Sequence, residues 1–247
     1  MRSFPAEFSD LLNSKGRKWM ADHTAGSRPP ARNGFFELID GIMDPATARS
    51  CIGLLDRSLY PLLRPYVDRI PRGSISGMSR NYSESLPKTM SMKTCILLSR
   101  RFREFEPAEA IGLVSMLRSG SLREFAEAST GLRLERPSPQ VILYESGDYV
   151  GPHNDHHPQN DRVKNGFVDL HIMFGNDAVE HQWLVYEEER HLKKIRDVNL
   201  KGGVAVYRLP FWHYTTPLAA RPGREKQARR WLLLASFEIA RRVGRAA

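Results

Sequence analysis

Residues 144–155 read Tyr144-Glu-Ser-Gly-Asp-Tyr-Val-Gly-Pro-His153-Asn-Asp155, and this stretch decides how the rest of the chain is interpreted. Its last three residues place an imidazole and a carboxylate two positions apart. On a β-strand, that spacing directs both side chains to the same face of the sheet. His213, far downstream, offers a third ligand. Two histidines and one carboxylate can bind a metal ion on one side and leave its other coordination positions open.

The residues around this stretch predict a β core. From Pro137 onward, short runs rich in Val, Ile, Leu, Phe and Tyr alternate with turn clusters. This rhythm is typical of an antiparallel β sandwich or barrel. The runs lie at residues 140–144, 168–174, 182–187, 203–207 and 231–239.

The residues before Pro137 predict a largely helical half. Asp44-Pro45 has the residue types of an N-cap and the first helical position, and leucines at helical spacing follow it. Further helices are expected at 106–117 and 122–129, and short strands at 35–39 and 94–98.

We therefore expect an α+β fold with a mainly β core. Residues 1–34 mix Ser, Gly, Pro and Arg and are interpreted as an N-terminal arm. The expected division of the remaining chain is a single domain over 35–240, with helical support in 35–136 and the β core in 137–240, and a basic tail over 241–247.

The charge of the chain leaves its partners open. The 247 residues include 37 Lys plus Arg against 28 Asp plus Glu, a net charge of +9. Such an excess favours an anionic partner such as nucleic acid, a lipid head group or an acidic metabolite. The basic residues are scattered, however, and no aromatic residues alternate with them, so we favour a solvated basic surface.

Other features indicate a cytoplasmic protein without a membrane partner. No apolar run approaches the ~18 to 20 residues of a membrane-spanning helix, and the first residues lack the apolar stretch of a secretory signal. Cys51 and Cys95 lie among apolar residues and match no metal-binding spacing. Buried free thiols are therefore expected rather than a disulfide.

The stretch at 144–155 resembles the 2-oxoglutarate- and Fe(II)-dependent dioxygenases, and among them the prolyl-4-hydroxylase-like branch. That branch has a strand reading Tyr-x-x-Gly-x-x-x-x-Pro-His-x-Asp. The matching residues here are Tyr144, Gly147, Pro152, His153 and Asp155.

The resemblance continues downstream and covers roughly residues 35 to 240. The second metal-binding strand of the branch reads His-x-x-x-Pro-Val or similar, and this chain has His213-Tyr-Thr-Thr-Pro217-Leu218. Fifty-seven residues separate Asp155 from His213, which lies within the range that the family uses. The resemblance implies a double-stranded β-helix, also called a jelly roll, with supporting N-terminal helices.

The resemblance also implies roles for the matching residues. His153, Asp155 and His213 would bind Fe(II) and form the catalytic centre. The cosubstrate 2-oxoglutarate would chelate the metal, with ascorbate as a further reductant that the family allows. Tyr144 aligns with a tyrosine that hydrogen-bonds the far carboxylate of 2-oxoglutarate.

That carboxylate also requires a buried cation, and the sequence offers several. Arg221 and Arg224 are closest to His213 but lie in a Pro-Gly loop. Arg229 and Arg230 begin a predicted strand, and the DNA-alkylation repair branch of the superfamily has its arginine at a spacing close to that of Arg230. We choose Arg230, with Arg229 as the alternative, because adjacent strand residues point to opposite faces.

Three other histidines could take part in the site. His156 and His157 lie in a turn rich in Pro and Asn and could replace His153 as ligand, but surface positions are favoured. His171 lies in an apolar strand, where a core histidine is favoured over a functional one. The polar segments 73–90 and 156–166 are expected to be substrate lids.

The sequence therefore predicts an oxygenase that hydroxylates a small molecule or a peptide residue and releases succinate and CO2. Two alternatives stay open. One is an oxidative demethylase or hydroxylase that acts on nucleic acid, which we rank lower. The other is a non-catalytic sensor that binds a metal or 2-oxoglutarate. The sequence predicts no oligomeric state.

Overall fold

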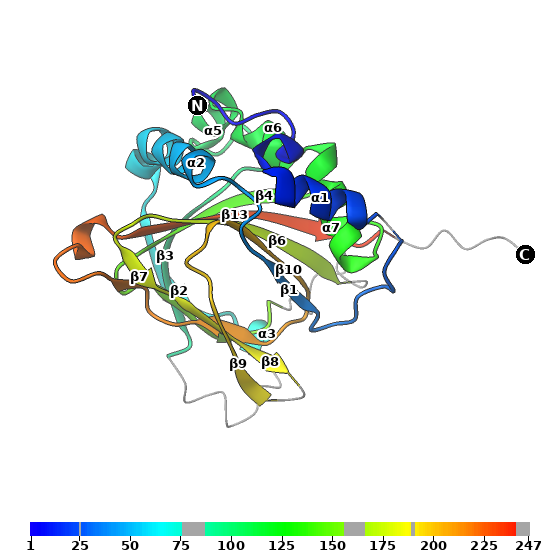
Figure 1. Cartoon of the computed structure of the whole chain (residues 1–247). Coiled ribbons are helices and arrows are strands. Elements are labelled where there is room, and N and C mark those ends of the chain that lie inside the picture. The colour runs from blue at the N-terminus through cyan, green and yellow to red at the C-terminus, as the bar shows by residue number, and fades with distance from the viewer. Residues whose placement is uncertain (25, 76–86, 156–165, 189–190, 241–247) are drawn as a thin grey trace, which may run out of the picture.

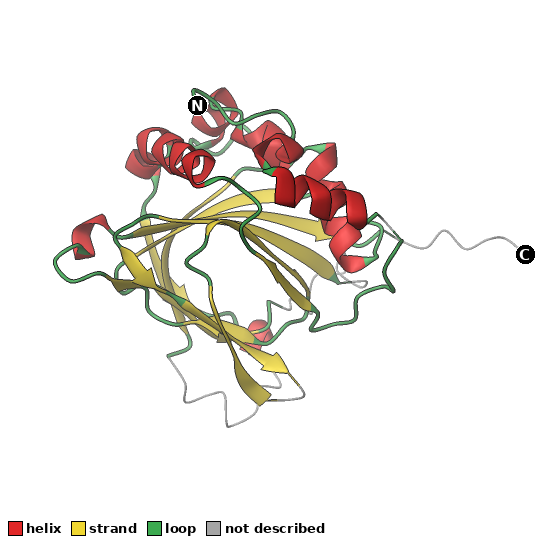
Figure 2. Cartoon of the chain, viewed as in Figure 1, coloured by secondary structure: helices red, strands yellow, loops and turns green. Residues whose placement is uncertain are grey.

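The structure of the chain, a computed structural model, describes residues 1–24, 26–75, 87–155, 166–188 and 191–240. Its strands form a curled sheet, and most of its helices gather on one outer face of that sheet (Figure 1, Figure 2). The strand pairs of the described residues are antiparallel. The expected α+β class with a mainly β core is confirmed.

Eleven strands of the described residues form the main sheet. They are β1 (Phe36–Ile39), β2 (Pro65–Arg69), β3 (Thr89–Ile96), β4 (Ser138–Glu145), β5 (Tyr149–His153), β6 (Phe167–Gly175), β8 (Trp183–Glu188), β9 (His191–Asp197), β10 (Lys201–Arg208), β11 (His213–Thr215) and β13 (Arg229–Glu238). Two short strands, β7 (Val179–His181) and β12 (Ala219–Ala220), pair with each other.

The sheet curls into two facing layers. One layer has the order β1-β10-β6-β13-β4-β3, and the other has the order β5-β11-β8-β9. Strand β3 joins them because it pairs with β4 along one part and with β5 along another. Apolar side chains from both layers pack in one cluster, which includes Ile142, Met173 and Leu232 from the first layer and Val150 and Leu184 from the second.

The period-2 alternation of strand β6 separates the two faces of the first layer. Val168, Leu170 and Ile172 pack in the cluster that includes the helices. Asp169 and His171 point the other way and line a cavity between the layers. Successive strand residues face opposite sides of a sheet. The polar residues of β6 therefore face the cavity, and its apolar residues face the helices.

The helices cover the outer face of the first layer (Figure 1). They are α1 (Ser14–Asp22), α2 (Pro45–Ser58), α5 (Phe105–Ala110), α6 (Leu113–Leu117) and α7 (Gly120–Thr130). A short helix, α3 (Arg72–Ile75), lies near the second layer instead. The chain also forms three 3-10 helices, η1 (Phe8–Leu11), η2 (Tyr60–Leu62) and η4 (Glu225–Gln227).

The helix boundaries follow from single residues. The predicted helix over 106–117 is two helices, because Gly112 adopts a left-handed φ of 76° between α5 and α6. Helix α7 confirms the prediction over 122–129. Ser119 caps its start by accepting a hydrogen bond from the Leu122 amide, and Gly131, with φ 64°, ends it.

The interpretation of residues 1–34 as an arm is wrong for their first part. Phe4, Phe8, Leu11 and Leu12 are all at most 3% exposed and belong to the helix-side core. The backbone amide of Phe4 donates to the Ile111 carbonyl at 2.7 Å. Composition predicted a linker here because it counts residue types and not the tertiary contacts that order them.

The structure also bears on the predictions for the cysteines, the C-terminal tail and the expected lids. Cys51 and Cys95 are buried free thiols, as predicted. The tail 241–247, His156, His157 and most of the two expected lids lie outside the described residues.

Within the described part of the chain, none of the helices has the length and apolar character needed to cross a membrane.

Candidate metal centre and its cavity

His153 and His213 face each other across a pair of strands. His153 ends β5, His213 begins β11, and the register of the pair places them directly opposite. Their ring centroids are 4.3 Å apart, and both residues are buried. Backbone pairing therefore brings together two histidines that are sixty positions apart in the sequence.

Asp155 reaches the same point by a different route. It lies two residues beyond His153, past the end of β5, with a left-handed φ of 54°. Asn154 fixes this bend, because its amide donates to Ser74 O at 2.9 Å and its carbonyl accepts from Phe211 N at 3.3 Å. The expectation that one strand would direct His153 and Asp155 to the same face is wrong, because the strand ends at His153 and the chain bends before Asp155. Aspartate tolerates the left-handed conformation of this bend better than most residues do.

The three side chains form a compact set of donor atoms. One ligand atom from each of His153, Asp155 and His213 lies within 4.8 Å of the others. Nε2 of His153 is 3.1 Å from Asp155 Oδ1, and Nε2 of His213 is 3.7 Å from Asp155 Oδ2.

Hydrogen bonds determine which ring nitrogen is free. Nδ1 of His153 lies 2.8 Å from the Gly151 carbonyl oxygen, and Nδ1 of His213 lies 2.7 Å from the Phe211 carbonyl oxygen. A carbonyl oxygen only accepts, so each Nδ1 carries the proton, and in a neutral ring Nε2 keeps its lone pair.

Those lone pairs point at Asp155, whose carboxylate is also an acceptor. Acceptors that face each other require a cation between them, either a proton on a ring or a metal ion. Two imidazole nitrogens and one carboxylate oxygen are a suitable ligand set for Fe(II), and they leave other positions of the metal open. The residues present therefore fit a mononuclear metal centre.

The protonation states agree with this ligand set. Burial alone would raise the pKa of Asp155, but the neighbouring imidazoles hold it well below its usual value. Burial lowers the pKa of His213 to about 4, helped by His153. Burial opposes the charging of His153 too, but Asp155 raises the pKa of His153 above its usual value. At neutral pH, Asp155 is ionised and His213 is neutral, as metal ligation requires.

The three residues line a cavity between the two layers of the sheet. Its volume is about 470 Å³, and its walls come from strands of both layers. Aromatic rings surround His213: the Phe211 ring stacks on it at 5.2 Å, and the Tyr207 ring lies 5.4 Å away. These rings keep one side of the candidate metal centre apolar.

A buried guanidinium lies in the wall of the same cavity. Arg230 is 1% exposed, and it is the first residue of β13 that faces the cavity. Its Nε donates to Val198 O at 2.6 Å, and its NH1 donates to Gln182 Oε1 at 2.9 Å. Burial lowers the pKa of Arg230 to about 10, so it stays charged at neutral pH. No ion pair between described residues includes Arg230.

Polar groups accompany this guanidinium. Tyr144 is opposite Arg230 in the β4–β13 pair, and the guanidinium lies 5.3 Å from its ring centroid. The Tyr144 hydroxyl hydrogen-bonds the Thr215 side chain, and burial raises the pKa of Tyr144 to about 12. A charged donor that lies beside neutral hydroxyls and forms no ion pair with the described residues is suited to bind the carboxylate of a ligand.

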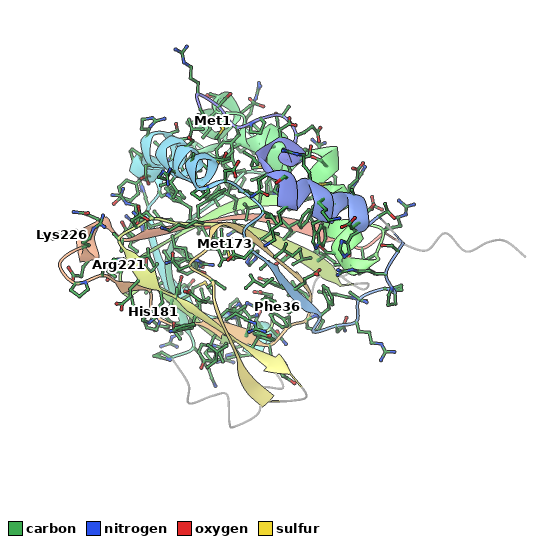
Figure 3. All side chains as sticks on the ribbon, in the orientation of Figure 1. Met1, Phe36, Met173, His181, Arg221 and Lys226 are labelled. Carbon is green, nitrogen blue, oxygen red and sulfur yellow. The ribbon has the colours of Figure 1, made fainter. Side chains whose placement is uncertain are left out.

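The other arginines lie elsewhere. Arg229 points to the helix side, where its guanidinium lies 3.8 Å from the Tyr60 ring centroid and 3.5 Å from Asp56. Arg221 and Lys226 lie at the edge of the molecule, in and just before η4, whereas Met173 of the cavity wall lies near its middle (Figure 3). Of the arginines considered, Arg230 is the one that lines the cavity.

Sequence reasoning missed part of the cavity wall. Thr215 was not singled out, and His171, which we favoured as a core histidine, lines the cavity with its Nε2 2.8 Å from the Tyr207 hydroxyl. Asp169, two residues before His171, was also missed. The alternation of polar and apolar residues in 168–174 was the available signal, because polar residues on the inner face of a buried strand require hydrogen-bond partners or a polar cavity.

Comparisons with known proteins support the fold. No protein-family model matches the chain, and no curated protein matches it in sequence. A 2OG-Fe(II) oxygenase family oxidoreductase from Burkholderia pseudomallei aligns with a TM-score of 0.56 and 13% identity over 92% of each chain. The non-heme alpha ketoglutarate dependent epimerase SnoN from nogalamycin biosynthesis aligns with a TM-score of 0.51 and 12% identity, over 92% of this chain and 83% of its own.

A Pseudomonas putida prolyl-4-hydroxylase aligns with a TM-score of 0.47 and 13% identity, over 95% of this chain and all of its own. At these identities the likeness establishes the fold. The jelly-roll core expected from the motifs is confirmed, and the chain shares its fold with 2-oxoglutarate- and Fe(II)-dependent oxygenases. Assignment to the prolyl-4-hydroxylase-like branch stays a prediction.

Proposed function

We propose that this protein is a 2-oxoglutarate- and Fe(II)-dependent oxygenase. The observation that carries the proposal is that one cavity contains both a candidate ligand set, His153, Asp155 and His213, and a buried guanidinium, Arg230, that forms no ion pair with the described residues. A metal centre alone would fit many reactions. A metal centre that shares a cavity with a site for a carboxylate is what a 2-oxo dicarboxylic acid requires.

Each residue has a role that its contacts support. His153, Asp155 and His213 would hold Fe(II), and the Nδ1 hydrogen bonds to Gly151 and Phe211 keep the two rings in the orientation that presents Nε2. With Fe(II) and 2-oxoglutarate bound, the site would supply oxidation of a substrate C–H bond by dioxygen, coupled to release of succinate and CO2.

Arg230 would bind the far carboxylate of 2-oxoglutarate through two charge-assisted hydrogen bonds. Tyr144 lies beside it, and its hydroxyl can accept from Thr215 while it donates its own proton to the same carboxylate. Val198 O and Gln182 Oε1 hold the guanidinium in place, so little side-chain entropy is lost on binding.

The favoured substrate is a small molecule or a peptide residue, and the favoured reaction is hydroxylation. The epimerase SnoN has the same fold, so product analysis must decide between hydroxylation and another oxidation. Nucleic acid is the lower-ranked substrate class. We also expect the activity of the enzyme to depend on ascorbate.

Anaerobic titration tests the metal and cosubstrate sites without knowledge of the substrate. Fe(II) with 2-oxoglutarate should give a weak visible charge-transfer band in the wild type, and His153→Ala or Asp155→Ala should abolish it. Arg230→Ala should weaken 2-oxoglutarate binding by roughly 10- to 100-fold, as expected for loss of hydrogen bonds to a charged group.

Matched controls separate these effects from general damage. His181→Ala and Arg221→Ala change a partly exposed histidine and an exposed arginine that do not line the cavity, and both should leave the band unchanged. Normal 2-oxoglutarate binding by Arg230→Ala would reject the cosubstrate site. Normal metal binding by His153→Ala would reject the metal centre.

A further inference from the structure

Asp169 is a buried acid that the proposed reaction does not use. It lies on β6 with its side chain in the cavity wall, and it is 5% exposed. Strand pairing places it opposite Tyr207 of β10 and Ser236 of β13. It is therefore in the first layer of the sheet, whereas the candidate metal ligands come from the second layer and the bend after it.

One oxygen of this carboxyl group has no partner. The Ser236 hydroxyl hydrogen-bonds the Asp169 carboxyl, but Oδ1 accepts no hydrogen bond from the described residues. A buried acceptor without a donor costs about 1–3 kcal/mol, and more when it is charged. In native proteins, such a group is accounted for by an ordered water or ion, by a catalytic role, or by stored strain. A position in the cavity wall makes a bound ligand a further way to supply the donor.

Asp169 and Arg230 lie at opposite ends of the cavity. Ser236, the β13 neighbour of Asp169, is six residues from Arg230 along that strand, which corresponds to roughly 20 Å. The Arg230 end suits a carboxylate. The Asp169 end has the hydroxyls of Ser138 and Ser236 in its wall and no cationic side chain among its described lining residues.

The neighbouring histidine does not supply a positive charge. His171 lines the same wall with Nε2 2.8 Å from the Tyr207 hydroxyl, and burial lowers the pKa of His171 to about 3. Burial also raises the pKa of Asp169 to about 7, with a smaller contribution from the negative charge of Asp155. An ammonium group at Oδ1 would favour the ionised form and supply the missing donor.

We propose that Asp169 binds a protonated amine of the substrate, through the oxygen that the protein leaves without a partner. The proposal rests on the function proposed above and specifies its substrate class: a molecule with an ammonium group, either a free amine or the lysine side chain of a peptide. Tyr207 and His171 line the wall between Asp169 and His213, so the oxidised carbon would lie a few bonds from the nitrogen.

Equilibrium binding of matched compounds tests this inference. The probes are primary alkylamines with their N-acetyl counterparts, and a lysine peptide with its N-acetyl-lysine counterpart. Calorimetry would measure them against the protein with Mn(II) and 2-oxoglutarate, which prevents turnover, and against the metal-free protein. We expect the wild type to bind the amine of at least one pair about tenfold more tightly than the acetylated form. The pair that shows the preference identifies the source of the amine.

Two variants assign the preference to one side chain. Asp169→Asn keeps the shape but removes the charge, and it should reduce the preference to about one while 2-oxoglutarate binding stays unchanged. Glu238→Gln removes an exposed acid from the rim of the same cavity and should keep the preference. Equal binding of both forms by the wild type would overturn the proposal without any variant. An amine preference that survives in Asp169→Asn, or one that disappears in Glu238→Gln, would also overturn the proposal.

The outcome is separable from that of the proposed function. If the wild type binds neither Mn(II) nor 2-oxoglutarate, the oxygenase proposal fails, and an amine preference that depends on Asp169 would still establish the amine site. If metal and cosubstrate bind normally and no amine is preferred, the amine site fails alone.

Discussion

His153 and His213 each use Nδ1 to donate to a backbone carbonyl two residues earlier, and this leaves one lone pair per ring for a metal ion. The sequence identified both histidines and Asp155. It did not identify the Nδ1 contacts, because a backbone carbonyl is present at every position and only the local bend aims it. Asp155 illustrates the same limit: its left-handed conformation depends on Asn154 contacts with Ser74 and Phe211.

Metal affinity should fall with acid in a way that reflects these two histidines. A proton and a metal ion compete for each Nε2, so affinity falls as pH drops through the pKa of each ligand. Asp155 raises the pKa of His153 against the opposing effect of burial, whereas burial lowers the pKa of His213 to about 4. Between pH 4.5 and 6, only His153 should then take up a proton in competition with the metal ion. The metal association constant should therefore fall about tenfold for each pH unit. Calorimetric Mn(II) binding across this range measures the slope; no slope, or two decades per unit, would contradict the assignment.

Asp169→Asn should stabilise the metal-free protein, and more so at higher pH. Burial raises the folded pKa of Asp169 to about 7, so the native state loses stability as pH rises above the unfolded value of ~3.9 and reaches the full penalty above pH 7. Asparagine carries no charge and avoids this penalty. The gain in unfolding free energy should increase by on the order of 2 kcal/mol between pH 5 and pH 8. Urea unfolding measures it, with Glu238→Gln as the exposed control; a gain that is equal at both pH values would mean that Asp169 is not desolvated.

At the scale of elements, strands β6 and β13 were predicted well and strand β2 was missed. The runs 168–174 and 231–239 are apolar because both strands lie in the middle of the first layer, covered by helices on one face and facing the cavity on the other. Strand β2 is exposed along its whole length and exists through its pairing with β3. Periodicity reports burial, so an exposed edge strand gives no signal.

Helix α7 depends on a glycine at its end. Gly131 has a φ of 64°, and a Cβ there would lie 2.5 Å from Arg28 O and 2.9 Å from Pro29 O. Gly131→Ala should therefore destabilise the protein by about 2 kcal/mol. Gly120→Ala, in the first turn of α7 with no atom within 4 Å of its Cβ, should be neutral or stabilise by up to ~1 kcal/mol. Chemical unfolding of both variants measures the contrast, and equal effects would refute the role of Gly131.

At the scale of the whole molecule, the two faces of the first layer have different roles. The face toward the helices is apolar and supports the fold, while the face toward the cavity carries Arg230, Asp169 and His171. The motif 144–155 and the strand rhythm were sufficient to predict this core. The N-terminal part of the support was not predictable from composition, because residues 1–34 resemble a linker in their content of Gly, Pro and Ser. Contacts with the distant Ile111 and Ser119 nevertheless order Phe4 and Phe8.

The first residues of the chain should therefore contribute to global stability as core residues do. Phe8 is fully buried, its ring meets the Phe125 ring edge-on at 5.3 Å, and its amide donates to Ser119 Oγ at 3.2 Å. Phe8→Ala should cost about 3–5 kcal/mol, the usual range for a buried phenylalanine. Phe102→Ala, at a phenylalanine that is 37% exposed, should cost about 1 kcal/mol or less. Urea unfolding monitored by tryptophan fluorescence and circular dichroism should show one transition that Phe8→Ala shifts as a whole. If Phe8→Ala unfolds no more easily than Phe102→Ala, residues 1–12 are an arm after all, and the helical support begins only near α2.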